Sequence, residues 1–158
     1  MHEKIFSGII RLMFSHNENE LIAIGQKIGH LLQARDVLIL SGDLGAGKTT
    51  LTKGIAQGLD IRQMIKSPTY TIVREYEGRL TLYHLDVYRI GDDPDSIDLD
   101  DFLFGEGVTV IEWGELLGEN LPEDYLKLIL LKREDGRELV FGAQGTRAQE
   151  LLEGLQND

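Results

Sequence analysis

The chain has 158 residues, which suits a single domain, and its 42% apolar residues and three prolines are typical of a folded globular protein. It has no cysteine, which excludes disulfides and thiolate metal sites and favours the cytoplasm. The net charge of −11 argues against a protein that grips nucleic acid by itself, because such binding neutralises phosphates with basic side chains. No apolar run is long enough to span a membrane.

The first segment of interest is residues 1–14. Its apolar part, Ile5 to Phe14, is interrupted by Arg11 and lacks a cleavage pattern, so we expect no signal peptide. Because Met13 lies inside it, three interpretations stay open: an additional start, a tag remnant or an edge strand.

A helix is predicted from the capping-box spacing of Ser15 to Glu18 and runs to about Gln33. The apolar residues of this segment recur at helical spacing and predict one buried stripe: Leu21, Ile24, Ile28, Leu31 and Leu32.

The next segment carries the strongest motif of the chain. Val37 to Leu40 predicts a buried strand, and Thr50 to Gly58 predicts a helix closed by glycine. Between them lies a loop with the spacing G-x-x-x-x-G-K-[ST], in the order strand, loop and helix that this motif requires. The loop consists of Gly42, Asp43, Leu44, Gly45, Ala46, Gly47, Lys48 and Thr49, and Thr50 follows it.

This loop has the chemistry of a phosphate-binding site. Glycines let the backbone wrap closely around phosphate oxygens, and the helix N-terminus favours an anion. Lys48 would reach the terminal phosphates, and the Thr49 hydroxyl would hold Mg²⁺. The sequence therefore predicts a protein that binds a nucleoside triphosphate.

The rest of the chain alternates short strands with turns and two helical segments. A first hairpin is predicted from Thr69 to Tyr76 and from Arg79 to Val87 across Glu77-Gly78. Asp93-Pro94 starts a short helical region to about Phe104, and Val108 to Ile111 is a short buried strand. A second hairpin joins Tyr125–Lys132 to Arg137–Phe141 across Asp135-Gly136, and Thr146 to Leu155 is a closing helix with Thr146 and Gln149 at capping spacing.

This order of elements predicts one α/β domain over residues 1–158. We expect the three-layer fold of P-loop NTPases, with a mixed, mostly parallel sheet that includes antiparallel hairpins.

Two acids end predicted strands near the loop. Ligands of parallel sheets bind at the carboxyl ends of the strands, so Asp86 and Glu112 are candidates to work with the phosphates. A helix cap or a salt bridge at the strand end remains the alternative for each. His84, inside a predicted strand, is more simply a core histidine with satisfied polar atoms, and Trp113 is more simply a packing residue.

Two further segments keep open interpretations. Ser67-Pro68-Thr69 lies where a nucleotide-sensing switch would be, although a plain turn is equally consistent. Arg89 could hold the aspartate segment in place, neutralise phosphate charge or form a surface ion pair. An acidic cluster reads as a solvated loop or as a docking face for a basic partner: Asp92, Asp93, Asp95, Asp98, Asp100 and Asp101.

Several nucleotide-binding classes are excluded by missing motifs. The chain has no Asn-Lys-x-Asp guanine-reading motif, and Arg89 stands where an Asp-x-x-Gly switch would have glycine. No segment resembles the arginine-rich lid of a small-molecule kinase. The chain is also shorter than a motor of the AAA type, which carries a second domain.

Taken together, four motifs resemble the TsaE (YjeE) family of bacterial ATPases, which are needed to make threonylcarbamoyladenosine in tRNA. The resemblance covers about residues 15 to 142 and includes GDLGAGKTT from Gly42, Ser67-Pro68-Thr69-Tyr70-Thr71, the segment Tyr83 to Arg89, and Ile111-Glu112-Trp113. It implies ATP and Mg²⁺ as ligands, a cytoplasmic protein, and action on the TsaD–TsaB pair. Contact with tRNA would then be indirect, through that complex.

The resemblance also implies roles for individual residues. Thr49, Asp86 and Glu112 would hold Mg²⁺, with Lys48, Asp86 and Glu112 serving hydrolysis. Ser67 and Thr69 would act as the switch, and the adenine pocket would be bounded by Glu18 and Gly136. The chain departs from the family pattern at Gly114, where proline is frequent, and at Leu21, where a small residue is frequent.

Rival functions of two other classes stay open. One is an assembly switch for which ATP binding alone is the signal, and the other is a phosphotransferase acting on a small molecule or a protein. The acidity suits a protein that reaches tRNA only through partners, since negative charge steers it toward a basic protein surface. We expect acidic residues in 92–101 or along the first helix to contact that partner.

Overall fold

The structure is a computed structural model that describes residues 10–43, 45–66, 73–87 and 105–156. Its elements are β1 (Ile10–Ser15), α1 (Glu18–Leu31), β2 (Val37–Gly42), α2 (Lys48–Gly58), β3 (Val73–Tyr76), β4 (Leu82–Asp86), β5 (Val108–Glu112), the 3₁₀ segment η3 (Gly114–Asn120), β6 (Tyr125–Arg133), β7 (Gly136–Gln144) and α4 (Thr146–Gln156). Several predicted features lie outside the described residues: Leu44, the Ser67–Thr69 switch, Arg89, the helix from Asp93 to Phe104 and the acidic cluster of residues 92–101.

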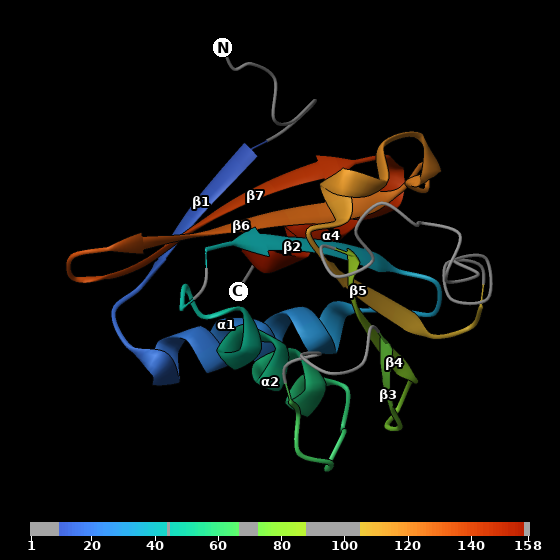
Figure 1. Cartoon of the computed structure of the whole chain (residues 1–158), viewed down its shortest axis with the longest axis horizontal. Helices are drawn as coiled ribbons and strands as arrows, with labels where there is room; N and C mark the ends of the chain where they lie inside the picture. Colours follow the sequence, from blue (N-terminus) through green and yellow to red (C-terminus); the bar gives the residue numbers. More distant parts are fainter. Residues whose placement is uncertain (1–9, 44, 67–72, 88–104, 157–158) are drawn as a thin grey trace.

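The strands form one sheet in the order β1-β7-β6-β2-β5-β4-β3 (Figure 1). Its centre is parallel, because β2 pairs with both β5 and β6 and β4 pairs with β5. The two edges are antiparallel, formed by the β3–β4 pair on one side and by β6, β7 and β1 on the other. The expected α/β fold with a mixed sheet and two hairpins is confirmed, and residues 10–15 are an edge strand.

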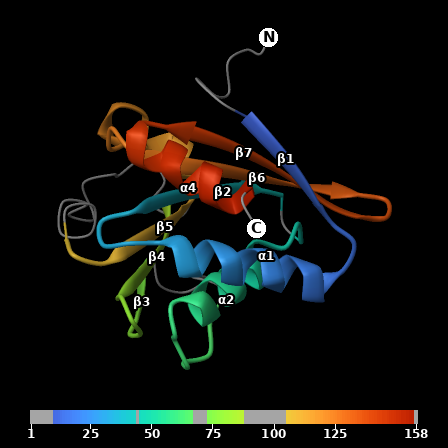
Figure 2. The same ribbon diagram turned by 180° about the vertical axis from the view of Figure 1, so that it is seen from behind.

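Each face of the sheet has its own apolar core. One core joins alternate strand residues such as Leu38, Leu40 and Phe141 to the buried sides of α1, α2 and α4. The other joins the intervening residues Val37 and Ile39 to the segment around η3. Figures 1 and 2 show α1 and α2 together beneath the sheet, with α4 beside them. The predicted apolar stripe of α1 is confirmed as part of the first core.

Helices α1 and α2 approach each other closely along two pairs of glycines. A Cβ atom at Gly29 would lie 2.3 Å from Ile55 O, and one at Gly54 would lie 2.3 Å from Ile22 O. Gly25 and Gly58 complete the contact with similarly short approaches. These backbones touch where any side chain would force the helices apart. The contact fixes α2, and with it the loop that precedes α2.

Two predicted boundaries are displaced in the structure. The N-cap of α1 is Asn17, whose side chain accepts from Glu20 N, and not Ser15. Ser15 is instead the last residue of β1 and pairs with Arg137, so the strand extends through the expected cap. The second hairpin turns at residues 134–135, because Gly136 already pairs with Arg133 in the sheet.

Helix α4 begins at Thr146, as predicted, but its cap differs from the predicted one. Thr146 is already helical, and Asp124 Oδ1 accepts from Arg147 N at 3.1 Å, so this first turn is capped by a side chain from a distant segment. The predicted pairing of Thr146 with Gln149 is therefore not the cap; Gln149 N donates to Gly145 O at 3.1 Å. Within the described ranges, no helix has both the length and the apolar character needed to cross a membrane.

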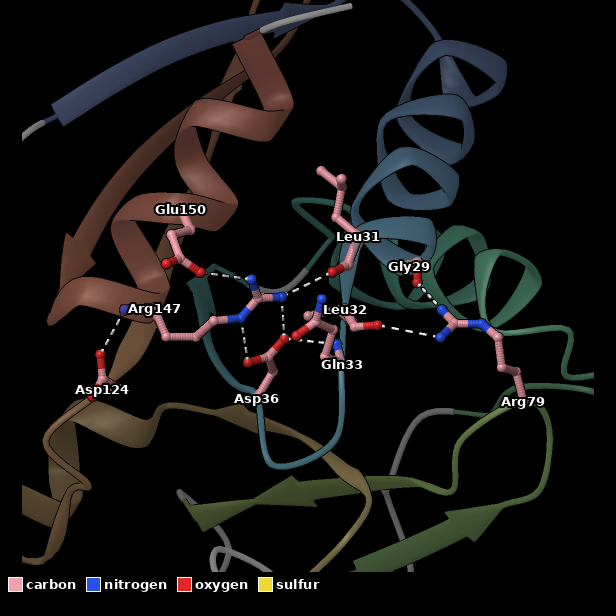
Figure 3. Close-up of polar contacts among 9 residues, drawn as sticks. All are labelled: Gly29, Leu31, Leu32, Gln33, Asp36, Arg79, Asp124, Arg147 and Glu150. Atoms are coloured by element: carbon pink, nitrogen blue, oxygen red, sulfur yellow. Dashed lines mark hydrogen bonds and ion pairs between the residues drawn. The ribbon is translucent and has the colours of Figure 1, made fainter.

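Two arginines from distant segments bind the C-terminal carbonyls of α1 (Figure 3). Arg79 Nη2 donates to Gly29 O at 2.8 Å, and Arg147 Nη2 donates to Leu31 O at 3.0 Å. Arg147 also donates from Nε to Asp36 Oδ1 at 3.0 Å and from Nη2 to Asp36 Oδ2 at 2.9 Å. The hydrogen bond to Asp36 is the main cause that raises the pKa of Arg147. This network joins α1, the start of β2 and α4.

Candidate functional site

The glycine loop lies between the carboxyl end of β2 and the N-terminus of α2, as predicted. Gly45 and Gly47 have φ values of 82° and 110°, which side chains rarely adopt. Ala46 between them is buried, and its N–H donates to Asp43 O at 3.0 Å, which closes a turn. The loop therefore surrounds the N-terminal amides of α2, an arrangement that suits an anion.

The side-chain ammonium of Lys48, the first residue of α2, contacts three neighbouring groups. Its Nζ donates to Gly42 O at the start of the loop and lies 3.9 Å from Glu112 Oε1. The same ammonium lies 4.8 Å from the centre of the Trp113 ring. Its side chain is only 13% exposed. The ammonium is thus held beside the loop and next to the acid that ends β5.

The two predicted acids come together at the carboxyl ends of neighbouring parallel strands. Asp86 ends β4 and Glu112 ends β5, and the two are register partners in the sheet. The Glu112 side chain is 6% exposed, and its Oε2 lies 2.7 Å from His84 Nε2. A salt bridge was the alternative to a functional role for Glu112. The ion pair that Glu112 forms is with Lys48 of the glycine loop, so this carboxylate lies at the candidate site.

His84 is a buried partner of Glu112, and the sequence patterns did not reveal that it belongs to the site. Its side chain is fully buried, and its Nε2 bonds to Glu112 as above. Its Nδ1 has no partner among the described residues, so the expected core histidine is satisfied at one nitrogen. A ring with hydrogen on Nε2 would donate to the Glu112 carboxylate. Such a ring fixes the orientation of the Glu112 carboxylate.

The residues after Glu112 attach this acid to the end of β2. Trp113 adopts a left-handed conformation, with φ 62° and ψ 32°, and its N–H donates to Leu40 O at 3.0 Å. The next acid, Glu115, accepts from Ser41 Oγ through both carboxylate oxygens, at 2.6 and 2.8 Å. A left-handed non-glycine residue is a strained conformation of the kind that clusters at functional sites. No pattern in the sequence pointed to the Ser41–Glu115 contact.

A cavity of about 280 Å³ lies beside the loop on the α1 side. Its lining includes the two predicted pocket residues, Glu18 and Gly136, together with Thr50 from α2. It also includes Arg137, which the sequence analysis placed only in a strand. His16 also lines the cavity; Glu20 accepts from its backbone N–H and its ring, and these hydrogen bonds lower the pKa of the Glu20 carboxyl.

The side-chain oxygens near the loop are suitable ligands for a hard cation. The Thr49 hydroxyl and the Asp86 and Glu112 carboxylates are all oxygen ligands, which Mg²⁺ prefers. The described residues contain no cluster of three or more acidic or histidine side chains that could bind a metal by themselves. Mg²⁺ in nucleotide sites is usually held by one or two carboxylates together with waters and substrate phosphates.

Comparisons with known proteins place this architecture in a family. Residues 15–139 match the family model described as threonylcarbamoyl adenosine biosynthesis protein TsaE. A Bacillus subtilis tRNA threonylcarbamoyladenosine biosynthesis protein TsaE is 45% identical over 141 residues, covering 88% of this chain and 89% of the relative. The corresponding protein of Treponema pallidum is 46% identical over 114 residues, covering 71% of this chain and 84% of the relative.

A solved structure agrees with these sequence matches. The crystal structure of Bacillus subtilis YdiB matches with a TM-score of 0.79 at 39% identity, covering 95% of this chain and 97% of that one. The expected family resemblance is confirmed: the chain belongs to the TsaE family, a family of tRNA threonylcarbamoyladenosine biosynthesis.

Proposed function

We propose that this protein binds Mg–ATP at the glycine loop and hydrolyses it slowly, in support of the threonylcarbamoylation of tRNA. The observation that carries the proposal is the convergence on one loop of Lys48, Glu112 and the N-terminus of α2. A phosphate bound there would meet backbone amides and an ammonium group, with a carboxylate next to them. Mg²⁺ would neutralise charge on the β- and γ-phosphates and would be held by Thr49, Asp86 and Glu112.

The protein's own residues divide the work around the phosphates. Lys48 turns from Gly42 O and Glu112 toward the phosphate oxygens and stabilises their charge. Glu112, held by His84, orients toward the reacting end of the triphosphate. Glu18, Thr50 and Gly136 border the space in which the adenosine part would lie.

Slow hydrolysis is expected from the isolated chain. Arg137, which borders the loop, donates to loop carbonyls and is therefore engaged. An arginine finger would then come from Arg89, which lies outside the described residues, or from a partner, and such a residue increases phosphoryl-transfer rates by roughly 10³–10⁵ where it is known. We propose that the partner is the TsaD–TsaB complex, that tRNA is reached only through it, and that the protein works in the cytoplasm. The family's place in this pathway supports the assignment.

The first test of this proposal is calorimetric titration of ATP and ADP in the presence of Mg²⁺. Binding of neither nucleotide would refute the proposal. If ATP binds, release of inorganic phosphate is then measured with and without TsaD and TsaB. A rate that the partners do not change would leave nucleotide binding supported and the partner assignment wrong, and transfer of the labelled phosphoryl group to another product would indicate a phosphotransferase.

Glu112→Gln separates hydrolysis from a binding-only switch. The variant keeps the side-chain shape, so ATP should bind while hydrolysis and support of tRNA modification are lost. Glu106→Gln is the matched control, because Glu106 is 79% exposed and pairs only with Arg35 among the contacts described. Full tRNA modification by the Glu112 variant would favour the binding-only switch.

A further inference from the structure

Arg137 connects the β6–β7 hairpin to the backbone of the glycine loop. Its Nε donates to Ala46 O at 2.9 Å, and its Nη2 donates to Gly45 O at 3.3 Å. Its Nη1 donates to Gly136 O at 2.9 Å, which fixes the guanidinium against its own strand. One planar side chain from β7 therefore binds two successive carbonyls of a loop 91 residues earlier in the chain.

These two hydrogen bonds determine the direction of the amides that follow. In a trans peptide the N–H of one residue points opposite to the C=O of the residue before it. Holding Ala46 O outward, toward Arg137, therefore turns the Gly47 N–H to the inner side of the loop. Holding Gly45 O outward likewise turns the Ala46 N–H inward, where it donates to Asp43 O.

The loop needs such a clamp because its own residues restrict it weakly. Gly45 and Gly47 have no side chains to pack, and glycine has more accessible backbone conformations than any other residue. A donor that is already oriented binds an anion without a reorganisation cost at the moment of binding. The arginine fork suits this task, because its rigid plane presents several N–H groups in fixed directions.

We propose that Arg137 is a positioning residue of the phosphate loop, which orients the Gly47 amide toward a polyphosphate through the loop carbonyls. The inference rests on the proposed function in one respect, the identity of the anion as the phosphates of ATP. Ordering of the loop by Arg137 is a property of the nucleotide-free protein and is testable separately.

The variants for the test are Arg137→Met and Arg137→Lys. Methionine keeps an apolar stem and removes every donor, whereas lysine keeps the charge but cannot hold two carbonyls in fork geometry. Arg133→Met in the same hairpin is the matched control, because Arg133 also lies near the start of the loop but bonds to Glu138 and, among the hydrogen bonds described, to no loop carbonyl. Thermal unfolding verifies that all variants are folded.

Two measurements are made on each variant. The first is ¹⁵N relaxation of the Ala46 and Gly47 amides in the nucleotide-free protein, which should show rigid amides in the wild type and in Arg133→Met but mobile ones in both Arg137 variants. The second is the Kd for ATP and ADP. In Arg137→Met the Kd should increase roughly ten- to a hundredfold, which is the range expected for the loss of charged hydrogen bonds.

The outcomes separate this inference from the proposed function. Amides that stay as ordered in Arg137→Met as in the wild type overturn the inference, even if affinity falls, because Arg137 would then touch the nucleotide directly. Mobile amides with nucleotide affinity within twofold of the wild type also overturn it. A wild-type protein that binds neither ATP nor ADP refutes the proposed function, while the relaxation data still decide whether Arg137 orders the loop.

Discussion

Replacing Arg147 by methionine tests how much of the stability comes from the network at the end of α1. The Asp36 side chain is 5% exposed and accepts from two nitrogens of Arg147 and from Gln33 N. The variant leaves this carboxylate buried with the backbone amide as its remaining partner in the network. It also leaves Leu31 O without its donor from Arg147.

The expected loss is about 3 kcal/mol. Breaking a buried ion pair by removing one partner costs roughly 3–5 kcal/mol, and we take the lower end because Arg147 is 27% exposed and water can enter. For a domain of this size that loss lowers Tm by roughly 6–12 °C. The hydrogen bond to Asp36 raises the pKa of Arg147, so its contribution is lost only at strongly alkaline pH and the difference between the proteins does not depend on Arg147 titration near neutral pH.

Urea unfolding of the wild type and Arg147→Met measures this loss directly, as a lower midpoint with unchanged slope. Arg133→Met is again the matched control, because the Arg133–Glu138 pair is exposed and such pairs contribute about 0–1 kcal/mol. A loss below about 1 kcal/mol for Arg147→Met would refute the assignment of a buried, essential pair. Nucleotide affinity should be unchanged, since Asp36 precedes β2 whereas the glycine loop follows its other end.

Three further predictions concern the helix contact, the buried pair and the α1 cap. Gly54→Ala should destabilise the protein although alanine favours helices, because the added methyl meets Ile22 O at 2.3 Å; a higher urea midpoint would contradict the close contact. His84→Leu should slow ATP hydrolysis roughly ten- to a hundredfold, with a smaller change in KM. His84→Gln keeps a hydrogen-bond donor and should recover part of the rate. Equal rates of hydrolysis in the two variants would exclude a positioning role for His84. NMR titration should place the pKa of the Glu20 carboxyl below its ordinary value of 4.5. The hydrogen bonds from His16 to the ionised Glu20 carboxylate therefore stabilise the start of α1 above that pH, and their contribution is lost as the pH falls through the folded-state pKa. An ordinary pKa would contradict the His16 contacts.

The sequence by itself determined the elements whose signals are local. The glycine spacing from Gly42 to Lys48 predicted the loop, because backbone conformation and helix start depend on adjacent residues. Alternating and continuous apolar patterns predicted β4, β5 and the two hairpins, and helical periodicity predicted α1. Asp86 and Glu112 were predicted as a pair because the carboxyl ends of parallel strands meet at one edge.

Tertiary structure alone decided which distant residues complete these elements. Pairing with β7 extended β1 through Ser15, so the cap of α1 moved to Asn17. The clamp by Arg137 and the bond from His84 to Glu112 join residues 91 and 28 positions apart. No local pattern encodes such contacts, because they depend on which strands become neighbours and which side of each faces the loop. The motif thus specified the glycine loop between a strand and a helix, whereas the assembled sheet determined how the loop is oriented and which acids lie beside it.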